Sequence, residues 1–100
     1  MSVVNESDQD VVVRAETDAG TYSKVVPART GGTVFNSFTS ARDTWTVVVF
    51  DGSCGRLTEI PFQDGGQVHL GTDGTISIEP FEWRGAPDIP RVTLTDQSCP

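Results

Sequence analysis

Residues 44–50 read Thr-Trp-Thr-Val-Val-Val-Phe, and this run limits the possible folds more than any other stretch of the chain. All of these residues are β-branched or aromatic, which fits a pleated, packed strand, and the Asp51-Gly52 pair that follows is typical of a turn. Side chains of a strand alternate between its faces. Here both faces carry apolar groups: Trp45, Val47 and Val49 on one, and Val48 and Phe50 on the other. We therefore expect a central strand, with Trp45 in the core.

Shorter segments elsewhere alternate between apolar and polar residues, with the period of two that is typical of a half-buried strand. Residues 10–16 and 21–26 predict a hairpin near the start of the chain. Four further segments are strand candidates: 2–5 as an edge piece, 33–38, 56–62, and 91–95 with Val92 and Leu94 facing inward.

Residues 67–79 give the clearest hairpin signal, because both arms alternate strictly around a glycine-containing turn. We expect Asp73-Gly74 in the turn and His69 exposed on the outward face. The side chains expected to point inward are Val68, Leu70, Ile76 and Ile78, and those expected to point outward are Gln67, His69, Thr75, Ser77 and Glu79.

The connections are expected to be irregular. After Pro27, which lacks a ladder donor, residues 29–32 read as a flexible link, and residues 39–43 read as a loop. Pro61 is expected to place its strand at an edge or a bulge, and residues 80–90 show no regular pattern.

Seven to nine short strands, with no segment of helical period, predict an all-β fold of one domain spanning residues 1–100. The expected architecture is a two-sheet antiparallel β-sandwich, immunoglobulin-like or jelly-roll-like in general outline, with a small barrel as the alternative. The specific immunoglobulin pattern is not matched. In that pattern a tryptophan follows the first cysteine, whereas Trp45 precedes Cys54.

The chain has two cysteines, and Cys54 and Cys99 are predicted to form a disulfide. Cys54 follows the central strand, and Cys99 lies in a terminal segment that would otherwise fray. The bridge would close the loop of residues 54–99, and the chain-entropy model gives it a stabilisation of about 4 kcal/mol as an upper estimate. The alternative is two inert thiols. Because disulfides persist in oxidising compartments, the bridge favours an extracytoplasmic location, although no targeting segment is recognised in the chain.

Fourteen acidic residues against seven basic ones give a net charge of −7. A nucleic-acid partner is not expected, because the chain lacks a basic footprint, and anionic lipid is disfavoured for the same reason. No apolar run approaches the roughly 18 residues of a membrane span, so direct membrane insertion is not expected either.

Catalytic and metal signatures are weak. His69 is the one histidine, and no motif supplies partners for a triad, a zinc site or a phosphate loop, so we expect neither an enzyme nor a cofactor. Several acidic turns suggest calcium, but none has the spacing of a calcium loop, and Asp-Gly is also what tight turns require. We expect no metal site. These turns are Asp8 with Asp10, Asp51-Gly52, Asp64-Gly65-Gly66 and Asp73-Gly74.

Trp83 is the best single candidate for ligand binding, because it lies in an irregular segment where side chains are less forced inward. With Phe81 and Tyr22 it could form an aromatic platform for a sugar or a peptide. The alternative is that Phe81 and Trp83 cap an open end of the sandwich.

The expected function is therefore a non-enzymatic interaction or structural module outside the cytoplasm, with a protein or cell-surface partner. Such a module could belong to a longer exported or membrane-anchored protein. The alternative is a carbohydrate- or calcium-binding module that uses loop residues near Trp83.

Overall fold

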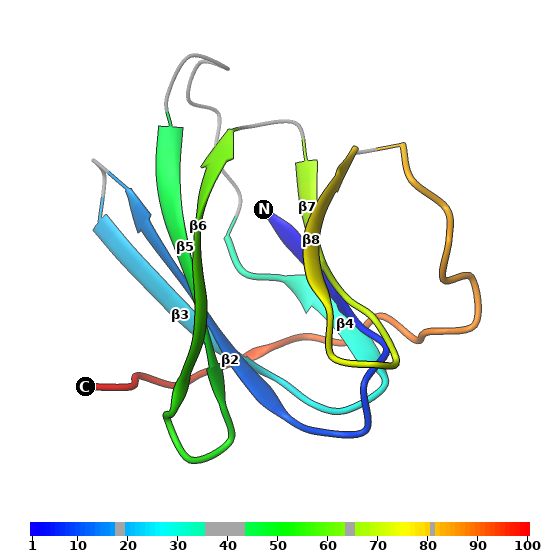
Figure 1. Ribbon diagram of the computed structural model, residues 1–100, viewed down its shortest axis with the longest axis horizontal. Coiled ribbons are helices and arrows are strands. Elements are labelled where there is room, and N and C mark those ends of the chain that lie inside the picture. Colours follow the sequence, from blue (N-terminus) through cyan, green and yellow to red (C-terminus); the bar gives the residue numbers. More distant parts are fainter. Residues whose placement is uncertain (18–19, 36–43, 64–65, 81) are drawn as a thin grey trace.

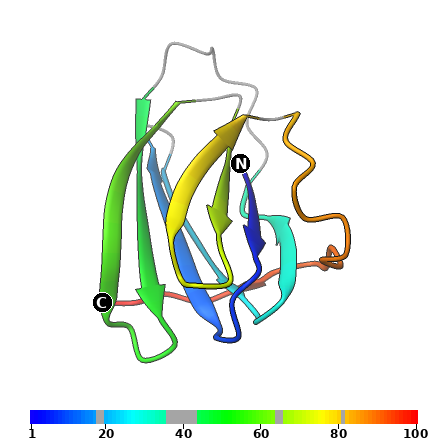
Figure 2. The same ribbon diagram turned by 45° about the vertical axis from the view of Figure 1, so that its right-hand side comes forward.

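The computed structural model describes residues 1–17, 20–35, 44–63, 66–80 and 82–100. These residues form two β-sheets packed face to face, with no helix among them (Figure 1, Figure 2). One sheet has four strands in the order β4-β1-β7-β8, and the other has five in the order β6-β5-β2-β3-β9. The predicted β-sandwich is confirmed, and the described strands do not close into a barrel. The strands are β1 (Ser2–Asn5), β2 (Val11–Thr17), β3 (Gly20–Val26), β4 (Thr30–Thr33), β5 (Thr44–Asp51), β6 (Arg56–Gln63), β7 (Gly66–Leu70), β8 (Ile76–Pro80) and β9 (Thr95–Asp96).

Strand β5 lies inside the five-stranded sheet, between β2 and β6. Trp45 is only 4% exposed, and it packs with Val47 and Val49 in the core between the sheets. The opposite face of β5 is also buried, through Val48 and Phe50. The central strand and its buried tryptophan are therefore confirmed.

Aromatic rings form a row at the edge of this core. The ring of Trp45 stacks on Phe62 with centroids 5.6 Å apart, and it meets Phe35 edge-on at 5.0 Å. Phe35 in turn stacks on Tyr22 at 4.8 Å. Such pairs contribute about 0.5 to 1.5 kcal/mol each beyond their burial, so the row ties β3, β5 and β6 together.

Strand β1 differs from its prediction, because it lies inside the four-stranded sheet rather than at an edge. It pairs antiparallel with β4 and parallel with β7, and the other strand pairs of the described residues are antiparallel. The β4 partner was expected to be a flexible link, since Gly31 and Gly32 have no strand preference. Their lack of a side chain is what the fold requires, because a Cβ on Gly32 would lie 2.5 Å from the carbonyl oxygen of Val92.

The remaining strands follow the sequence pattern with local differences. Both hairpins are present, β2 with β3 and β7 with β8, and β6 with Pro61 is an edge strand as expected. Ile78 is 37% exposed instead of buried, because β8 is the outermost strand of its sheet. Of the candidate strand 33–38, Thr33 ends β4 and residues 36–38 lie outside the described residues, as does the expected loop 39–43.

The last strand is shorter than expected. Residues 91–95 were predicted as one strand with two inward side chains, but the regular part is β9 alone, paired with β3. Leu94 is buried, whereas Val92 is 40% exposed. The reason is the path of this segment: it leaves β4 at Arg91, which is bridged to Gly31, and crosses to the other sheet (Figure 2).

The end of the chain then covers the outer face of the five-stranded sheet. The predicted disulfide is present, with the Cα atoms of Cys54 and Cys99 5.3 Å apart. Cys99 packs with Val12, Val48 and Phe50 in a small second core. We call residues 95–100 the tail cover.

Candidate functional site

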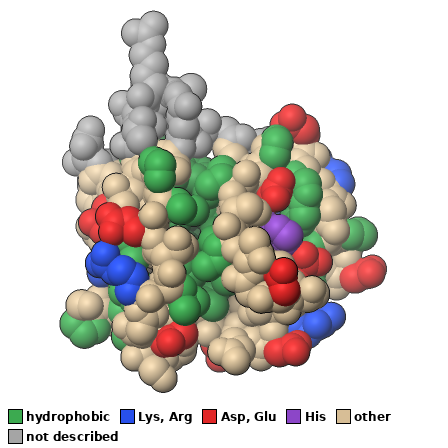
Figure 3. Space-filling view, in the orientation of Figure 1, with side chains coloured by type: hydrophobic (Ala, Val, Ile, Leu, Met, Phe, Trp, Pro, Cys, Tyr) green, Lys and Arg blue, Asp and Glu red, His purple; other side chains and the backbone are tan. Residues whose placement is uncertain are grey.

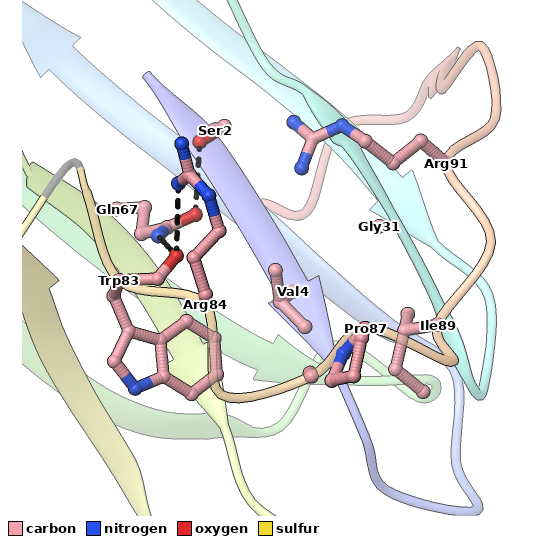
Figure 4. A pocket seen from close by; sticks show the side chains of 10 residues that line it. Ser2, Val4, Gly31, Gln67, Trp83, Arg84, Pro87, Ile89 and Arg91 are labelled. Carbon is pink, nitrogen blue, oxygen red and sulfur yellow. Dashed lines mark hydrogen bonds between the residues drawn. The ribbon is translucent and has the colours of Figure 1, made fainter.

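The outer face of the four-stranded sheet is covered by the irregular residues 82–91, which we call the loop cover. Between this segment and the sheet lies a pocket of about 480 Å³, named here the Trp83 pocket (Figure 4). Its lining comes from β1, β4 and β7 and from the loop cover: Ser2, Val4, Gly31, Gln67, Trp83, Arg84, Ala86, Pro87, Ile89 and Arg91.

Strand pairing determines which side chains reach this pocket. Val3 and Val68 lie side by side in the register of β1 and β7, and both are buried in the core. Their neighbours along each strand therefore point to the outer face. On that face Ser2 lies beside Gln67, and Val4 lies beside Gly31, whose missing side chain leaves room for the pocket.

Gln67 anchors the loop cover to the sheet. Its Nε2 donates to the carbonyl oxygen of Pro80 at 3.3 Å. Figure 4 shows two further hydrogen bonds: Nε2 donates to the carbonyl oxygen of Trp83 at 3.3 Å, and Oε1 accepts from Ser2 Oγ at 3.4 Å. The amide is correctly predicted to point outward, but the loop cover buries it. Gln67 thus fixes the backbone that carries Trp83.

The ring of His69 also contacts Trp83, with the ring centroids 4.4 Å apart. Its Nε2 is 2.5 Å from Glu6 Oε2, and its Nδ1 is 3.8 Å from Glu79 Oε1. Figure 3 shows the histidine side chain flanked by acidic groups. The prediction of an exposed His69 is wrong, since the indole and the two carboxylates leave its side chain only 16% exposed.

The basic residues divide into two groups. Four of those that the structure describes pair with carboxylates: Arg14 with Glu16, Lys24 with Asp96, Arg29 with Asp8, and Arg56 with Glu59. Arg84 and Arg91 have no carboxylate partner among the described residues, and both line the Trp83 pocket. The nearby acidic residues of the loop cover, Glu82 and Asp88, are outside the pocket lining.

The expected aromatic platform does not form as a unit. Trp83 lines the pocket, but Tyr22 belongs to the aromatic row of the core and lines a different hollow, beside the tail cover. Phe81 lies outside the described residues. Among the described residues, Trp83 lines the pocket beside polar and charged side chains and apart from Tyr22.

Two of the acidic turns use a carboxylate oxygen in their own hydrogen bonds, whereas Asp64 and Gly65 lie outside the described residues. Asp51 Oδ1 accepts hydrogen bonds from the backbone N–H groups of Ser53 and Gly55, at 2.9 and 2.8 Å. The backbone N–H of Thr75 donates to Asp73 Oδ1 at 2.9 Å and holds the pKa of that carboxyl below its ordinary value. Among the described residues, no group of three or more His, Cys, Asp or Glu side chains could hold a metal ion.

Three of the polar and charged lining residues, Gln67, Arg84 and Arg91, were not predicted as site residues. Arg84 could have been found, because it follows Trp83 in the same irregular segment. Gln67 and Arg91 gave no local signal, since their place in the pocket depends on the pairing of β1 with β7 and on the path of the loop cover.

No family model matches this chain, and neither a curated protein nor a solved structure shows significant similarity to it. The described residues contain no helix long and apolar enough to cross a membrane. Because these comparisons found no similar protein, the geometry of the site is the basis for its proposed function.

Proposed function

We propose that this chain is a non-enzymatic interaction module that works outside the cytoplasm and binds its partner at the Trp83 pocket. The observation that carries the proposal is the pocket itself. Its floor is a hydrogen-bonded sheet face, and its wall is an irregular segment that presents an indole and two arginines. Binding residues commonly lie on loops that a rigid scaffold positions.

The chemistry of the pocket supports binding over catalysis. Ser2 Oγ donates to Gln67, and the imidazole of His69 contacts carboxylates. Among the described residues, no hydroxyl or thiol is hydrogen-bonded to His69, so a nucleophile activated by this base is not assembled there. The disulfide supports a location in an oxidising compartment.

Carbohydrate binding is the second candidate, and Trp83 favours it. Saccharide sites combine an apolar surface for the ring with a few polar groups that fix its orientation. The indole of Trp83, with the hydroxyl oxygen of Ser2 and the two arginines, has this composition. Calcium binding gains no such support, because Asp51 and Asp73 each use a carboxylate oxygen within their own turn.

An array of glycans and extracellular-type peptides tests the proposal, with the labelled oxidised protein as probe. Trp83→Ala is the test variant, and Leu57→Ser is the control, because Leu57 is exposed on strand β6 outside the pocket. We expect binding that Trp83→Ala abolishes and Leu57→Ser leaves unchanged. An array with no binding, or binding that survives Trp83→Ala, would contradict the proposal.

A further inference from the structure

We propose that the Trp83 pocket binds a saccharide residue carrying a carboxylate, of the uronic acid type, and that Arg84 and Arg91 recognise the carboxylate. This inference rests on the proposed function and specifies its ligand. It follows from the charge, the placement and the surroundings of the two arginines.

The charge distribution is the first step. In a chain of net charge −7, carboxylates are abundant, and the other described basic residues are all paired with them. Arg84 and Arg91 are unpaired within the described residues, and both face one pocket. A guanidinium offers a planar fork of donors that matches a carboxylate in a bidentate geometry. The pair therefore supplies two cationic groups that no carboxylate of the described residues neutralises.

The placement of the two groups is the second step. Figure 4 shows Arg84 and Arg91 on opposite sides of β1, with both guanidinium groups toward its Ser2 end. One donor of Arg84 is occupied, since Nη1 bonds to the carbonyl oxygen of Trp83 at 3.2 Å. This bond orients the side chain and leaves its other donors for a ligand. Arg91 is positioned by its backbone bridge to Gly31.

The surroundings favour a sugar ring over other acidic ligands. The pocket volume of about 480 Å³ is within the range of small-molecule sites. Trp83 and Ile89 provide apolar wall, and the hydroxyl oxygen of Ser2 provides an acceptor near the arginines. Both donors of the Gln67 amide are already bonded to backbone carbonyls. Ring carbons and hydroxyls of one saccharide unit match this mixture, with the carboxylate at the arginines.

An acidic peptide is disfavoured by the strand pairing at the pocket. Peptides often bind by adding a strand to an open sheet edge. Beside this pocket the edge of β4 is occupied, because Gly31 N donates to the Pro90 oxygen at 2.9 Å and Val92 N donates to the Gly31 oxygen at 2.8 Å. The net charge of −7 also opposes capture of a long polyanion by a diffuse charged surface.

Calorimetry with digalacturonate tests the inference, with its neutral counterpart digalactose, an acidic tetrapeptide and sulfate as comparison ligands. The variants are Arg84→Gln and Arg91→Gln, which remove the charge and retain a polar side chain. Arg56→Gln is the matched control, because Arg56 is paired with Glu59 on β6 outside the pocket. Circular dichroism and melting temperature verify that each variant is folded.

We expect the parent and Arg56→Gln to bind digalacturonate equally, and each pocket variant to bind it about tenfold more weakly or worse, as expected for a lost charged hydrogen bond. The parent protein should bind digalactose no more tightly than the two pocket variants bind digalacturonate. Equal binding of both sugars, tighter binding of the peptide or sulfate, unaltered variants, or no binding of digalacturonate would each overturn the inference. If Trp83→Ala then still abolishes binding of another ligand on the array, the proposed function stands without this ligand class.

Discussion

The two sheets of this sandwich each carry a segment over their outer face, and the two segments are held in different ways. The tail cover is fastened by the Cys54–Cys99 disulfide, by the pairing of β9 with β3, and by a hydrogen bond from Arg14 Nη1 to the Cys99 oxygen at 3.1 Å. It also buries apolar side chains of β2 and β5. The loop cover is held by hydrogen bonds of the Gln67 amide, by the contact of Trp83 with His69, and by a short bridge to β4.

This difference supports the proposal that the loop cover carries the binding surface and that the tail cover is structural. Over the tail cover, apolar burial and a covalent bond leave few groups for a partner. Both covers border a hollow, but the contacts of the loop cover are mainly polar, and two cations beside it lack carboxylate partners among the described residues. Beside the tail cover, Arg14 and Lys24 are paired with carboxylates. Regions with few buried apolar contacts open at low free-energy cost, and binding loops are drawn from them.

The largest effect is expected in the core that both faces share. Trp45→Ala should lower the free energy of unfolding by about 3 to 5 kcal/mol, because it removes a buried aromatic ring and leaves a cavity. Urea unfolding of the oxidised protein measures this loss, and the losses caused by changes at the two covers are compared with it. A loss below about 1 kcal/mol would show that the aromatic row contributes little to the stability of the core.

The next effect is expected at the tail cover. Reducing the disulfide, or replacing both cysteines by Ala, should cost up to about 4 kcal/mol by the chain-entropy model, since the bridge closes a loop with a sequence separation of 45. Chemical denaturation with and without reductant measures the loss. The double variant is the control, because it should be insensitive to reductant. Equal stability of the oxidised and reduced protein would mean that the tail cover stays in place without its covalent bond.

A smaller effect on stability is expected at the loop cover. Trp83→Ala should cost about 1 kcal/mol, because the indole is only partly buried and lies outside both apolar cores. The same variant should abolish ligand binding, so stability and binding separate at this residue. A loss of unfolding free energy as large as that of Trp45→Ala would mean that Trp83 is a structural residue. The two covers would then not differ in the way described.

The smallest effect concerns Asp73, in the turn of the hairpin beneath the loop cover. Its pKa is lowered in the folded state, chiefly by the hydrogen bond from the backbone N–H of Thr75. The carboxylate therefore stabilises the fold above its unfolded pKa of about 3.9, and this contribution disappears as the pH falls through the lower folded pKa. Near pH 6 the parent should therefore have a higher melting temperature than Asp73→Asn. In strong acid the two melting temperatures should converge. A difference that persists there would contradict this cause.

The local pattern of the sequence predicts the parts of the fold that depend on local chemistry. Strand β5 follows from its run of β-branched residues, and the β7–β8 hairpin follows from alternation around Asp73-Gly74. The pairing of β1 with β4 and β7 could not be predicted, because it joins distant segments and uses Gly31 and Gly32, which have no strand preference.

The candidate site is less predictable for the same reason. Trp83 is recognisable from its place in an irregular segment, but the burial of His69 and Gln67 depends on where that segment folds back. Arg84 and Arg91 are unremarkable in the sequence. They become candidates only when the other described basic residues are seen to be paired.

Hydrogen exchange of two backbone amides in the oxidised, ligand-free protein tests the contrast between the covers most directly. The amide of Trp83 bonds to the Pro80 oxygen at 2.9 Å in the loop cover, and that of Gln97 bonds to the Ser23 oxygen at 3.1 Å in the tail cover. We predict that the Trp83 amide exchanges through local opening, many times faster than the Gln97 amide, and that reductant accelerates Gln97 alone. Equal protection of the two amides, or faster exchange at Gln97, would contradict the assignment of one cover to the fold and the other to binding.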